Sequence, residues 1–261
     1  MKNTPVTIKA IAATLNVSIS TVSRALRDMP EVRAETRAAV QRLAAELDYQ
    51  PNQLAKNLLY SRTRTIGVLM PNLSYHFYTA MLASIEEAAL AAGYSLLVCQ
   101  SNESHEREII NIQNLLRGQV EGFLLSVARD STDYEHIARL TRRNFPLVLF
   151  DRYADEINAS KVIIDDKGAA YRATEHLIEQ GCRRIGFLAG PPNLLISNQR
   201  LLGYRAALVQ YGLPLNDAYM LHCDLTPEDA RTQTNRLMNL PAPPMACLWL
   251  ATALPTPPCS R

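Results

Sequence analysis

The sequence has no long apolar run, no regular spacing of cysteines and none of the common catalytic motifs. No stretch approaches the roughly 18 consecutive apolar residues of a membrane-spanning helix. The amino-terminal segment MKNTPVTIKAIAATLNV carries polar residues where a secretion signal has an unbroken apolar core. We therefore expect a cytoplasmic protein with no membrane partner.

The cysteines are odd in number, lie far apart and form no C-x-x-C pair. They are Cys99, Cys182, Cys223, Cys247 and Cys259. This pattern indicates neither a disulfide framework nor a zinc knuckle, so we expect reduced thiols.

The signatures of several enzyme classes are also absent. The sequence contains no G-x-x-x-x-G-K-S/T, G-x-G-x-x-G, H-E-x-x-H or G-x-S-x-G, and its histidines are scattered without the spacing of metal ligands. Asp165 and Asp166 could act as paired carboxylates, but adjacent residues on a strand point to opposite faces, so a helix cap is preferred. We expect no enzyme, no cofactor and no metal. A nucleotide-using enzyme is the rival of a different class, and the missing phosphate loop counts against it.

Charge is distributed unevenly along the chain. Residues 1–64 hold ten Lys and Arg against five Asp and Glu, a net charge of +5, whereas residues 65–261 hold seventeen against twenty, a net charge of −3. A basic amino-terminal segment on a mildly acidic body favours a polyanionic partner for that segment.

Apolar residues recur at spacings of three and four between Thr7 and Leu47, which predicts three short helices. Asn16 ends the first helix, the segment 28–30 (DMP) ends the second and the segment 49–51 (YQP) ends the third.

After Arg64 the pattern changes to apolar runs of strand length that alternate with amphipathic stretches. The expected strands are TIGVLM, SLLVCQ, VEGFLLS, PLVLFD, KVIID and RRIGFLAGPP. Alternation of strand and helix predicts an α/β fold with parallel sheets. The similarity of RRIGFLAGPP to TIGVLMPN suggests two lobes built alike, the second beginning at KVIID.

The segment 17–26, VSISTVSRAL, has the features of a helix that reads DNA. Ser18 is placed to cap the helix by accepting a backbone N–H near Thr21, and Val22, Ala25 and Leu26 face inward. The other face carries short hydroxyls suited to phosphates, with an arginine suited to guanine. Ile19 is placed to contact a thymine methyl.

The segment 49–64, YQPNQLAKNLLYSRTR, can form a second DNA-contacting element. Leu54 and Leu58 lie four residues apart, and Ala55 leaves one side of such a helix thin. Protruding leucines can enter a minor groove and wedge apart a base step. Composition alone favours an ordinary linker.

The order of these motifs, from VTIKAIA and VSISTVSRAL through YQPNQLAKNLL and RTIGVLMP to GCRRIGFLAGP, resembles the LacI/GalR (lac-repressor) family of bacterial transcription factors from Thr7 through about Met245. The resemblance implies a repressor without enzyme activity that binds a palindromic operator as a homodimer, with Leu58 entering the central minor groove. Ile19, Ser20 and Arg24 match base-reading positions. The full set of DNA-binding residues it implies is Thr7, Ser18, Ile19, Ser20, Thr21, Ser23, Arg24, Asn52, Leu54, Ala55 and Leu58.

Two departures from the family pattern affect helix starts. Ala10 replaces a common aspartate, and Arg33 replaces a usual capping serine. Both changes are expected to weaken the start of a helix without removing a base contact.

For the body, the resemblance implies two lobes like those of periplasmic sugar-binding proteins, with a sugar or nucleoside-like effector in the cleft. The expected effector-binding residues are Asn72, Phe77, Tyr78, Asp151 and Arg200. Some relatives carry a ligand-binding arginine where this chain has Leu194 or Asn198, so the effector cannot be transferred from them. Effector binding is expected to alter lobe closure and thereby operator affinity.

The end of the chain departs from the family pattern, because PAPPMACLWLATALPTPPCSR has three prolines after the expected strand start and no helical period. We interpret this as a truncation or frameshift near Ala246 that leaves the second lobe incomplete and weakens dimerisation. A defective regulator and a sugar-binding or nucleotide-using α/β protein with a basic head remain as alternatives. The predicted divisions are a head (1–50), a hinge (51–63) and a body (64–261), with a first lobe (64–158), a second lobe (159–246) and an aberrant tail (247–261).

Overall fold

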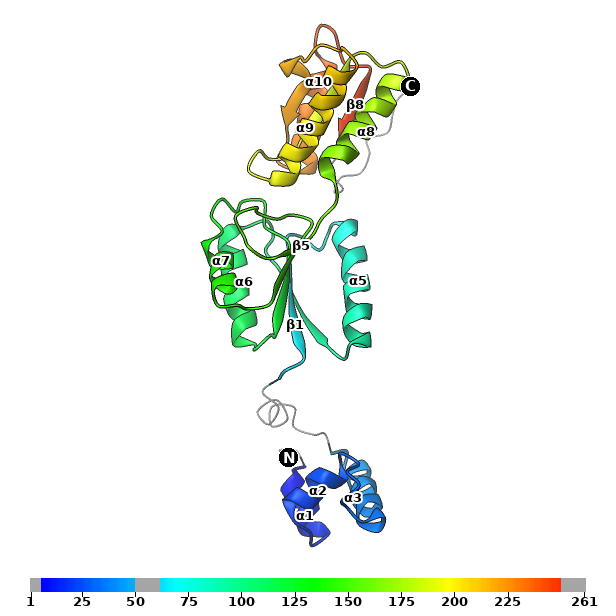
Figure 1. Cartoon of the computed structure of the whole chain (residues 1–261), viewed down its shortest axis with the longest axis vertical. Coiled ribbons are helices and arrows are strands. Elements are labelled where there is room, and N and C mark those ends of the chain that lie inside the picture. The colour runs from blue at the N-terminus through cyan, green and yellow to red at the C-terminus, as the bar shows by residue number, and fades with distance from the viewer. Residues whose placement is uncertain (1–5, 50–61, 250–261) are drawn as a thin grey trace. The chain divides into compact units, whose positions relative to one another are not determined.

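The computed structural model describes residues 6–49 and 62–249. The chain divides into two compact units, Met1–Arg62 and Thr63–Arg261. Figure 1 shows the helical first unit and the α/β second unit.

The first unit contains the three predicted helices: α1 (Ile8–Thr14), α2 (Ile19–Ala25) and α3 (Ala34–Glu46). Their apolar faces meet in one small core. Its buried members are Ile11, Ala12, Val22, Ala25, Val32, Val40 and Ala44. The predicted inward stripe of α2 is therefore confirmed at Val22 and Ala25.

Asn16 makes the turn between α1 and α2. Its φ is 50°, a left-handed conformation that Asn tolerates better than most residues. The Val17 N–H donates to the Ala12 carbonyl at 3.0 Å, and the Asn16 N–H donates to the Ala13 carbonyl at 3.3 Å. These two bonds satisfy the last carbonyls of α1 in a Schellman motif, so α1 stops there and the chain can start α2 two residues later.

The helix starts differ in how they are capped. The Thr7 hydroxyl accepts the Ala10 N–H at 3.3 Å, so α1 keeps a cap without the family's aspartate. Arg33 precedes α3 and offers no side-chain cap, which agrees with the weakened start predicted there.

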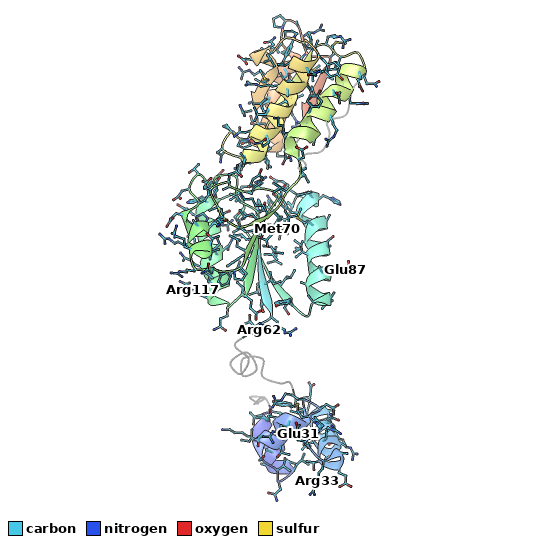
Figure 2. All side chains as sticks on the ribbon, in the orientation of Figure 1. Glu31, Arg33, Arg62, Met70, Glu87 and Arg117 are labelled. Carbon is cyan, nitrogen blue, oxygen red and sulfur yellow. The ribbon has the colours of Figure 1, made fainter. Side chains whose placement is uncertain are left out.

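The first lobe of the second unit is a five-stranded parallel sheet in the order β2-β1-β3-β4-β5 (Figure 1). Its strands are β1 (Thr65–Met70), β2 (Ser95–Gln100), β3 (Gly122–Leu125), β4 (Leu147–Phe150) and β5 (Ser160–Val162). Its helices are α5 (His76–Ala91), α6 (His105–Arg117) and α7 (Glu135–Arg142). Met70 is fully buried, whereas Glu87 and Arg117 lie on the outer surfaces of their helices (Figure 2).

One strand lies in a different lobe from the one predicted. The segment KVIID was expected to open the second lobe at residue 159, but β5 pairs with β4 in the first sheet, with Val148 opposite Ser160 and Phe150 opposite Val162. The predicted division between 158 and 159 is therefore too early. A short apolar run predicts a strand but does not reveal its partner, since pairing of parallel strands is decided over long sequence distances.

The second lobe contains a three-stranded parallel sheet in the order β7-β6-β8. Its strands are β6 (Ile185–Ala189), β7 (Met220–His222) and β8 (Ala246–Trp249). Its helices are α8 (Asp166–Glu179), α9 (Leu195–Gln210) and α10 (Pro227–Met238), with a 3₁₀ turn, η1 (Asp217–Tyr219), before β7.

The prediction that an aberrant tail begins at residue 247 is wrong for residues 247–249. They continue β8, where Cys247 lies opposite Gly186 and Trp249 opposite Leu188. The pairing keeps the parallel register of the lobe through the point at which the sequence pattern changes. Residues 250–261 lie outside the described part of the chain.

Gly203 allows α9 to lie directly against α8. A Cβ atom at this position would come within 2.1 Å of the Lys167 carbonyl oxygen and 2.9 Å of the Tyr171 nitrogen. Only a residue without a side chain permits this helix separation. The tight contact fixes the position of α9, whose first two turns contribute Ser197 and Arg200 to the cavity described below.

In the described ranges, no helix combines the length and the apolar character needed to cross a membrane.

Candidate functional site

Helix α2 presents a polar, exposed surface opposite its buried face. Ser18, Ile19, Ser20 and Arg24 are exposed, and 45% of the Ile19 surface is accessible. A single exposed apolar residue is common on protein surfaces, so only the polar neighbours of Ile19 make it informative. Its position beside the hydroxyl groups fits contact with a second macromolecule.

The Ser18 hydroxyl organises the beginning of α2. Its oxygen accepts the Thr21 N–H at 3.0 Å, which confirms the predicted cap. It also lies 2.8 Å from the Ser20 hydroxyl and 2.8 Å from the Thr21 hydroxyl. The three hydroxyls therefore form one cluster whose members can donate outward to phosphate oxygens or base edges.

Ser23 is already bonded within the helix, which sequence spacing did not indicate. Arg27 donates from Nε to the Ser23 carbonyl at 3.0 Å and from Nη2 to the Ser23 hydroxyl at 3.2 Å. The Arg27 side chain thus lies along the end of α2. Of the predicted residues, Thr7 lies at the start of α1 with an exposed side chain.

The hinge residues expected to contact DNA lie outside the described part of the chain. They are Asn52, Leu54, Ala55 and Leu58.

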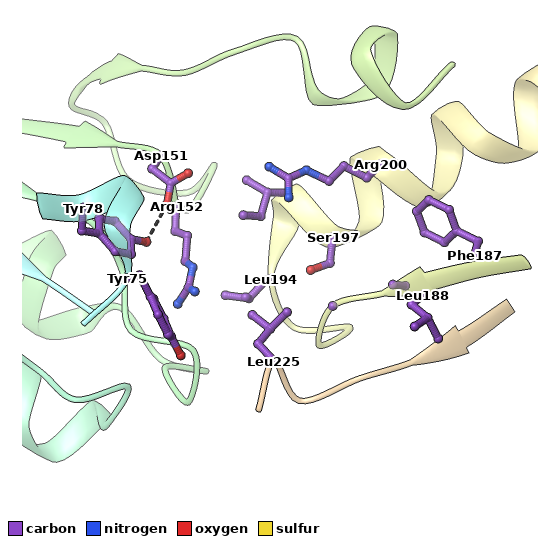
Figure 3. A pocket seen from close by; sticks show the side chains of 13 residues that line it. Tyr75, Tyr78, Asp151, Arg152, Phe187, Leu188, Leu194, Ser197, Arg200 and Leu225 are labelled. Atoms are coloured by element: carbon purple, nitrogen blue, oxygen red, sulfur yellow. Dashed lines mark hydrogen bonds between the residues drawn. The ribbon is translucent and has the colours of Figure 1, made fainter. Parts of the chain in front are cut away.

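In the second unit, a cavity is lined by residues of both lobes (Figure 3). From the first lobe come Tyr75 and Tyr78, which follow β1, and Asp151 and Arg152, which follow β4; the second lobe contributes Leu188, Leu194, Ser197, Arg200 and Leu225 among others. Small molecules in open α/β sheets bind at this carboxyl edge of the strands. The cavity measures about 40 Å³, enough for a water or two and too small for a sugar.

Tyr78 and Asp151 form a partly buried polar contact at this cavity. The Tyr78 hydroxyl donates to Asp151 Oδ2 at 2.6 Å and lies 3.3 Å from the Ser126 hydroxyl. Burial raises the pKa of Tyr78 well above its usual range. Burial also raises the pKa of Asp151, although the Tyr78 hydrogen bond and the charges of Arg152 and Arg200 act in the opposite direction.

Arg200 is held by a carboxylate that sequence reasoning had assigned to helix capping. Its Nε donates to Asp166 Oδ1 at 2.6 Å, and the two side chains are 18% and 6% exposed. Asp165 is the helix cap, since it accepts the Gly168 N–H at 2.8 Å. Of the two adjacent acids, one therefore caps α8 and the other orients the arginine of the cavity.

Arg152 is the charged residue of the cavity that the sequence did not reveal. It is buried and its Nη1 donates to Glu103 Oε2 at 2.6 Å, while the Arg129 N–H donates to the same oxygen at 2.9 Å. The second oxygen, Glu103 Oε1, is buried without a hydrogen-bond partner among the described residues. Glu103 is not among the residues that line the cavity, so its carboxylate acts there through Arg152, which it holds in place.

Five effector-binding residues were expected, and three of them line the cavity: Tyr78, Asp151 and Arg200. Asn72 instead accepts the Ser74 N–H at 2.8 Å in a local turn. Phe77 packs on the apolar cluster beneath α5, with its ring centre 5.3 Å from that of Tyr78. Neither is among the residues that line the cavity.

Leu194 and Asn198 were both candidates for the position of the family's ligand-binding arginine. Leu194 lines the cavity and Asn198 does not, because the Asn198 amide donates to the Pro192 carbonyl at 2.8 Å. An apolar side chain therefore stands on the second-lobe side of the cavity, together with Leu225 (Figure 3).

Two family models match the chain. Residues 7–52 match the bacterial regulatory proteins of the lacI family, and residues 63–253 match the periplasmic binding proteins and sugar binding domain of the LacI family. The second match extends past Met245, the point to which the sequence motifs carry the resemblance.

Curated relatives cover nearly the whole chain. It is 32% identical over 245 residues to the HTH-type transcriptional repressor CytR of Escherichia coli (strain K12), which covers 94% of this chain and 71% of that protein. It is 31% identical to the catabolite control protein A of Priestia megaterium, over 92% of this chain and 72% of that protein.

A solved structure with the same fold is the crystal structure of the lac repressor dimer bound to operator and the anti-inducer ONPF. The TM-score is 0.82 at 26% sequence identity, covering 94% of this chain and 74% of that chain.

Proposed function

The chain belongs to the LacI family of bacterial regulatory proteins, and from that premise we propose that α2 reads operator DNA while the cavity between the lobes binds a sugar or nucleoside. The family is one of DNA-binding transcriptional repressors and not of enzymes. The observation that carries the proposal is the exposed face of α2, with Ile19, Ser20 and Arg24 opposite a buried Val22 and Ala25.

The role of each residue follows from its chemistry. The Ser18, Ser20 and Thr21 hydroxyls are placed to donate to phosphate oxygens and fix the helix in the major groove. Arg24 supplies the paired donors that guanine recognises, and Ile19 supplies an apolar contact for a thymine methyl. By resemblance, Leu58 enters the minor groove at the centre of a palindromic site, which requires a homodimer.

Selection of binding sites from randomised duplex DNA tests this reading, with the full chain and with Arg24→Ala. Loss of a bidentate arginine contact costs about 1–3 kcal/mol of discrimination at one base pair. The matched control is Arg42→Ala, since Arg42 is an exposed arginine on α3 and its removal changes the charge equally. We expect Arg24→Ala to erase the preference at one position of each half-site and Arg42→Ala to leave the motif unchanged.

Two results would contradict the proposal. One is a selected motif that Arg24→Ala leaves intact, which would place base reading elsewhere. The other is salt-sensitive binding with no motif, because a merely basic head attracts DNA of any sequence. Leu58→Ala, in the same selection, is expected to remove the preference for a flexible pyrimidine–purine step at the centre.

The ligand of the cavity is proposed from its lining. Asp151 can accept hydrogen bonds from hydroxyl groups, Arg200 and Ser197 can donate, and the Tyr75 ring and the Leu225 side chain can cover an apolar ring edge. Hydroxyl groups on a small ring are the feature that sugars and nucleosides share. Because the cavity measures about 40 Å³, binding requires the lobes to separate, and a ligand that favours one lobe arrangement shifts operator affinity by its difference in affinity.

A thermal-shift screen of pentoses, hexoses and nucleosides tests the ligand class. A ligand at one hundred times its Kd stabilises a protein by about 2.7 kcal/mol. Stabilisation that is lost in Asp151→Asn and kept in Asp217→Asn, whose carboxylate is 96% exposed, would support the cavity as the site. Equal loss in both variants, or stabilisation by no member of the panel, would refute the proposed class.

We also propose that the protein acts in the cytoplasm, where the operator DNA of a bacterial repressor is found.

A further inference from the structure

Helices α6 and α7 bring together two histidines and a glutamate that take no part in the proposed function. His105 and Glu108 are three residues apart on α6, which places them on one face of the helix. His136 comes from the first turn of α7. None of the three lines the cavity between the lobes.

Ligand-capable atoms of these three residues all lie within 4.8 Å of one another. Glu108 is fully buried, and its Oε1 lies 2.8 Å from His136 Nε2. The rings of His105 and His136 meet edge to face, with their centres 5.0 Å apart. The Ser131 hydroxyl completes the group, 2.8 Å from Glu108 Oε1 and 3.4 Å from His105 Nδ1.

We propose that His105, Glu108 and His136 form a binding site for a divalent transition metal of the zinc type. Two imidazoles and one carboxylate form a donor set that proteins use for such ions. Bonds of about 2.0–2.2 Å in a tetrahedron place ligand atoms roughly 3.3–3.6 Å apart, so small side-chain rotations suffice from the observed separations. The fourth position is available to water or to the Ser131 hydroxyl.

The hydrogen bonds around Glu108 are compatible with a metal. Glu108 Oε2 accepts the Ala128 N–H at 2.7 Å and can keep that bond when Oε1 binds the ion. Bonds from the ion to His136 Nε2 and Glu108 Oε1 replace the hydrogen bond between these two atoms. The bound nitrogen must be unprotonated, so a neutral ring carries its proton on the other nitrogen, Nδ1, whereas an imidazolium releases one proton to solvent. The Ser131 hydroxyl also gives up its contacts with Glu108 Oε1 and His105 Nδ1.

The proposed site adjoins a segment that connects the two lobes. Residues 128–131 are bonded to Glu108 through the Ala128 N–H and the Ser131 hydroxyl. The same segment reaches the second lobe, because Arg129 Nη1 donates to the Asp224 carbonyl at 2.6 Å. The Asn193 amide reaches the Ser131 carbonyl at 3.5 Å. A metal bound beneath Ser131 would therefore fix a segment through which the lobes meet.

A second group, Cys223, Asp224 and Asp229, also brings potential ligands within reach of one another. Burial raises the pKa of the Cys223 thiol to about 11, which disfavours the thiolate that a metal requires. Asp224 is also engaged in a local turn before α10, where it accepts the Thr226 N–H at 2.8 Å. This group serves as the competing site in the experiment.

The test is titration of the full chain with Co²⁺, followed by absorption spectroscopy and by equilibrium dialysis for stoichiometry. Variants His136→Ala and His105→Phe each remove one ligand, and phenylalanine retains a ring for the contact with His136. Each is expected to weaken binding by at least about tenfold, since even an outer partner of a metal ligand contributes roughly 10–100-fold. Melting curves without metal establish that both variants are folded.

Matched controls separate this site from others. His176→Ala removes an exposed histidine from the end of α8, and Cys223→Ser disables the competing group. One Co²⁺ per chain, without a thiolate charge-transfer band, kept in both controls and lost in His136→Ala and His105→Phe, would support the proposal. Binding that survives both ligand variants, binding that is lost in Cys223→Ser, or no binding at all would overturn it.

Discussion

Replacing Tyr78 by phenylalanine isolates the hydrogen bond at the centre of the cavity. The change removes one oxygen, which donates to Asp151 Oδ2 at 2.6 Å, and leaves the ring in its apolar surroundings. A hydrogen bond to a charged group contributes about 1.5–3 kcal/mol, and one between neutral groups about 0.5–1.5 kcal/mol. We expect Tyr78→Phe to lower the free energy of unfolding by about 2 kcal/mol at pH 7.

The same substitution should be pH-dependent, because Asp151 titrates differently in the folded and unfolded chain. Burial raises its folded-state pKa above the unfolded value, and the Tyr78 hydrogen bond opposes that rise. A carboxyl of this kind contributes stability that is fully present below its unfolded pKa of about 3.9 and is lost as pH rises through the folded pKa. Without the Tyr78 hydroxyl the folded pKa rises further, so the loss at pH 7 becomes larger.

Urea unfolding at pH 4 and pH 7, followed by far-ultraviolet circular dichroism, measures both effects. The double-mutant partner is Asp151→Asn, which keeps an oxygen acceptor and removes the charge. In that background Tyr78→Phe should cost only about 1 kcal/mol and should cost the same at both pH values. Equal costs in the two backgrounds, with no dependence on pH, would refute the reasoning, because the Tyr78 hydroxyl would then not be stabilising a carboxylate.

Two further predictions concern local geometry. Ser18→Ala should lower the stability of the first unit by about 1 kcal/mol in urea unfolding, since the cap to Thr21 is lost, whereas Ser18→Asn, which keeps an oxygen that can accept the Thr21 N–H, should cost little; equal losses would mean that the hydroxyl does not act as a cap. Gly203→Ala should destabilise the second lobe by roughly 1–3 kcal/mol, because its Cβ would lie 2.1 Å from the Lys167 carbonyl oxygen. Hydrogen exchange of α8 and α9 locates that effect, and unchanged protection would mean that the helices can move apart at little cost.

Predictions from the sequence succeeded where neighbouring residues decide the structure. Ser18 caps α2 and Asn16 ends α1 because both use backbone groups within a few positions of themselves. The predicted strands were also placed correctly, because strands of a parallel sheet are covered by helices on both faces and therefore appear as short continuous apolar runs. The family resemblance followed from these same local patterns, and it supplied the roles of Ile19 and Arg24 that composition alone does not give.

The contacts that assemble the cavity could not be predicted from local sequence patterns. Tyr78 meets Asp151 across 73 residues, and Arg200 meets Asp166 across 34. Arg152 was not singled out because a buried arginine and an exposed one look the same in a sequence. The histidines look scattered because they lie far apart in the sequence, although the fold brings His105 and His136 together around Glu108.

The sequence by itself therefore determined the three helices of the first unit, most of the strands and the class of protein, because each depends on short-range backbone bonding or on motif order; the short strand β7 and the last residues of α2 and α3 were not predicted. Only the tertiary structure decided that β5 joins the first sheet, that β8 continues past Ala246 and that Leu194 rather than Asn198 lines the cavity. The physical reason is that strand pairing and cavity lining depend on contacts between segments far apart in the chain, which local residue pattern does not specify.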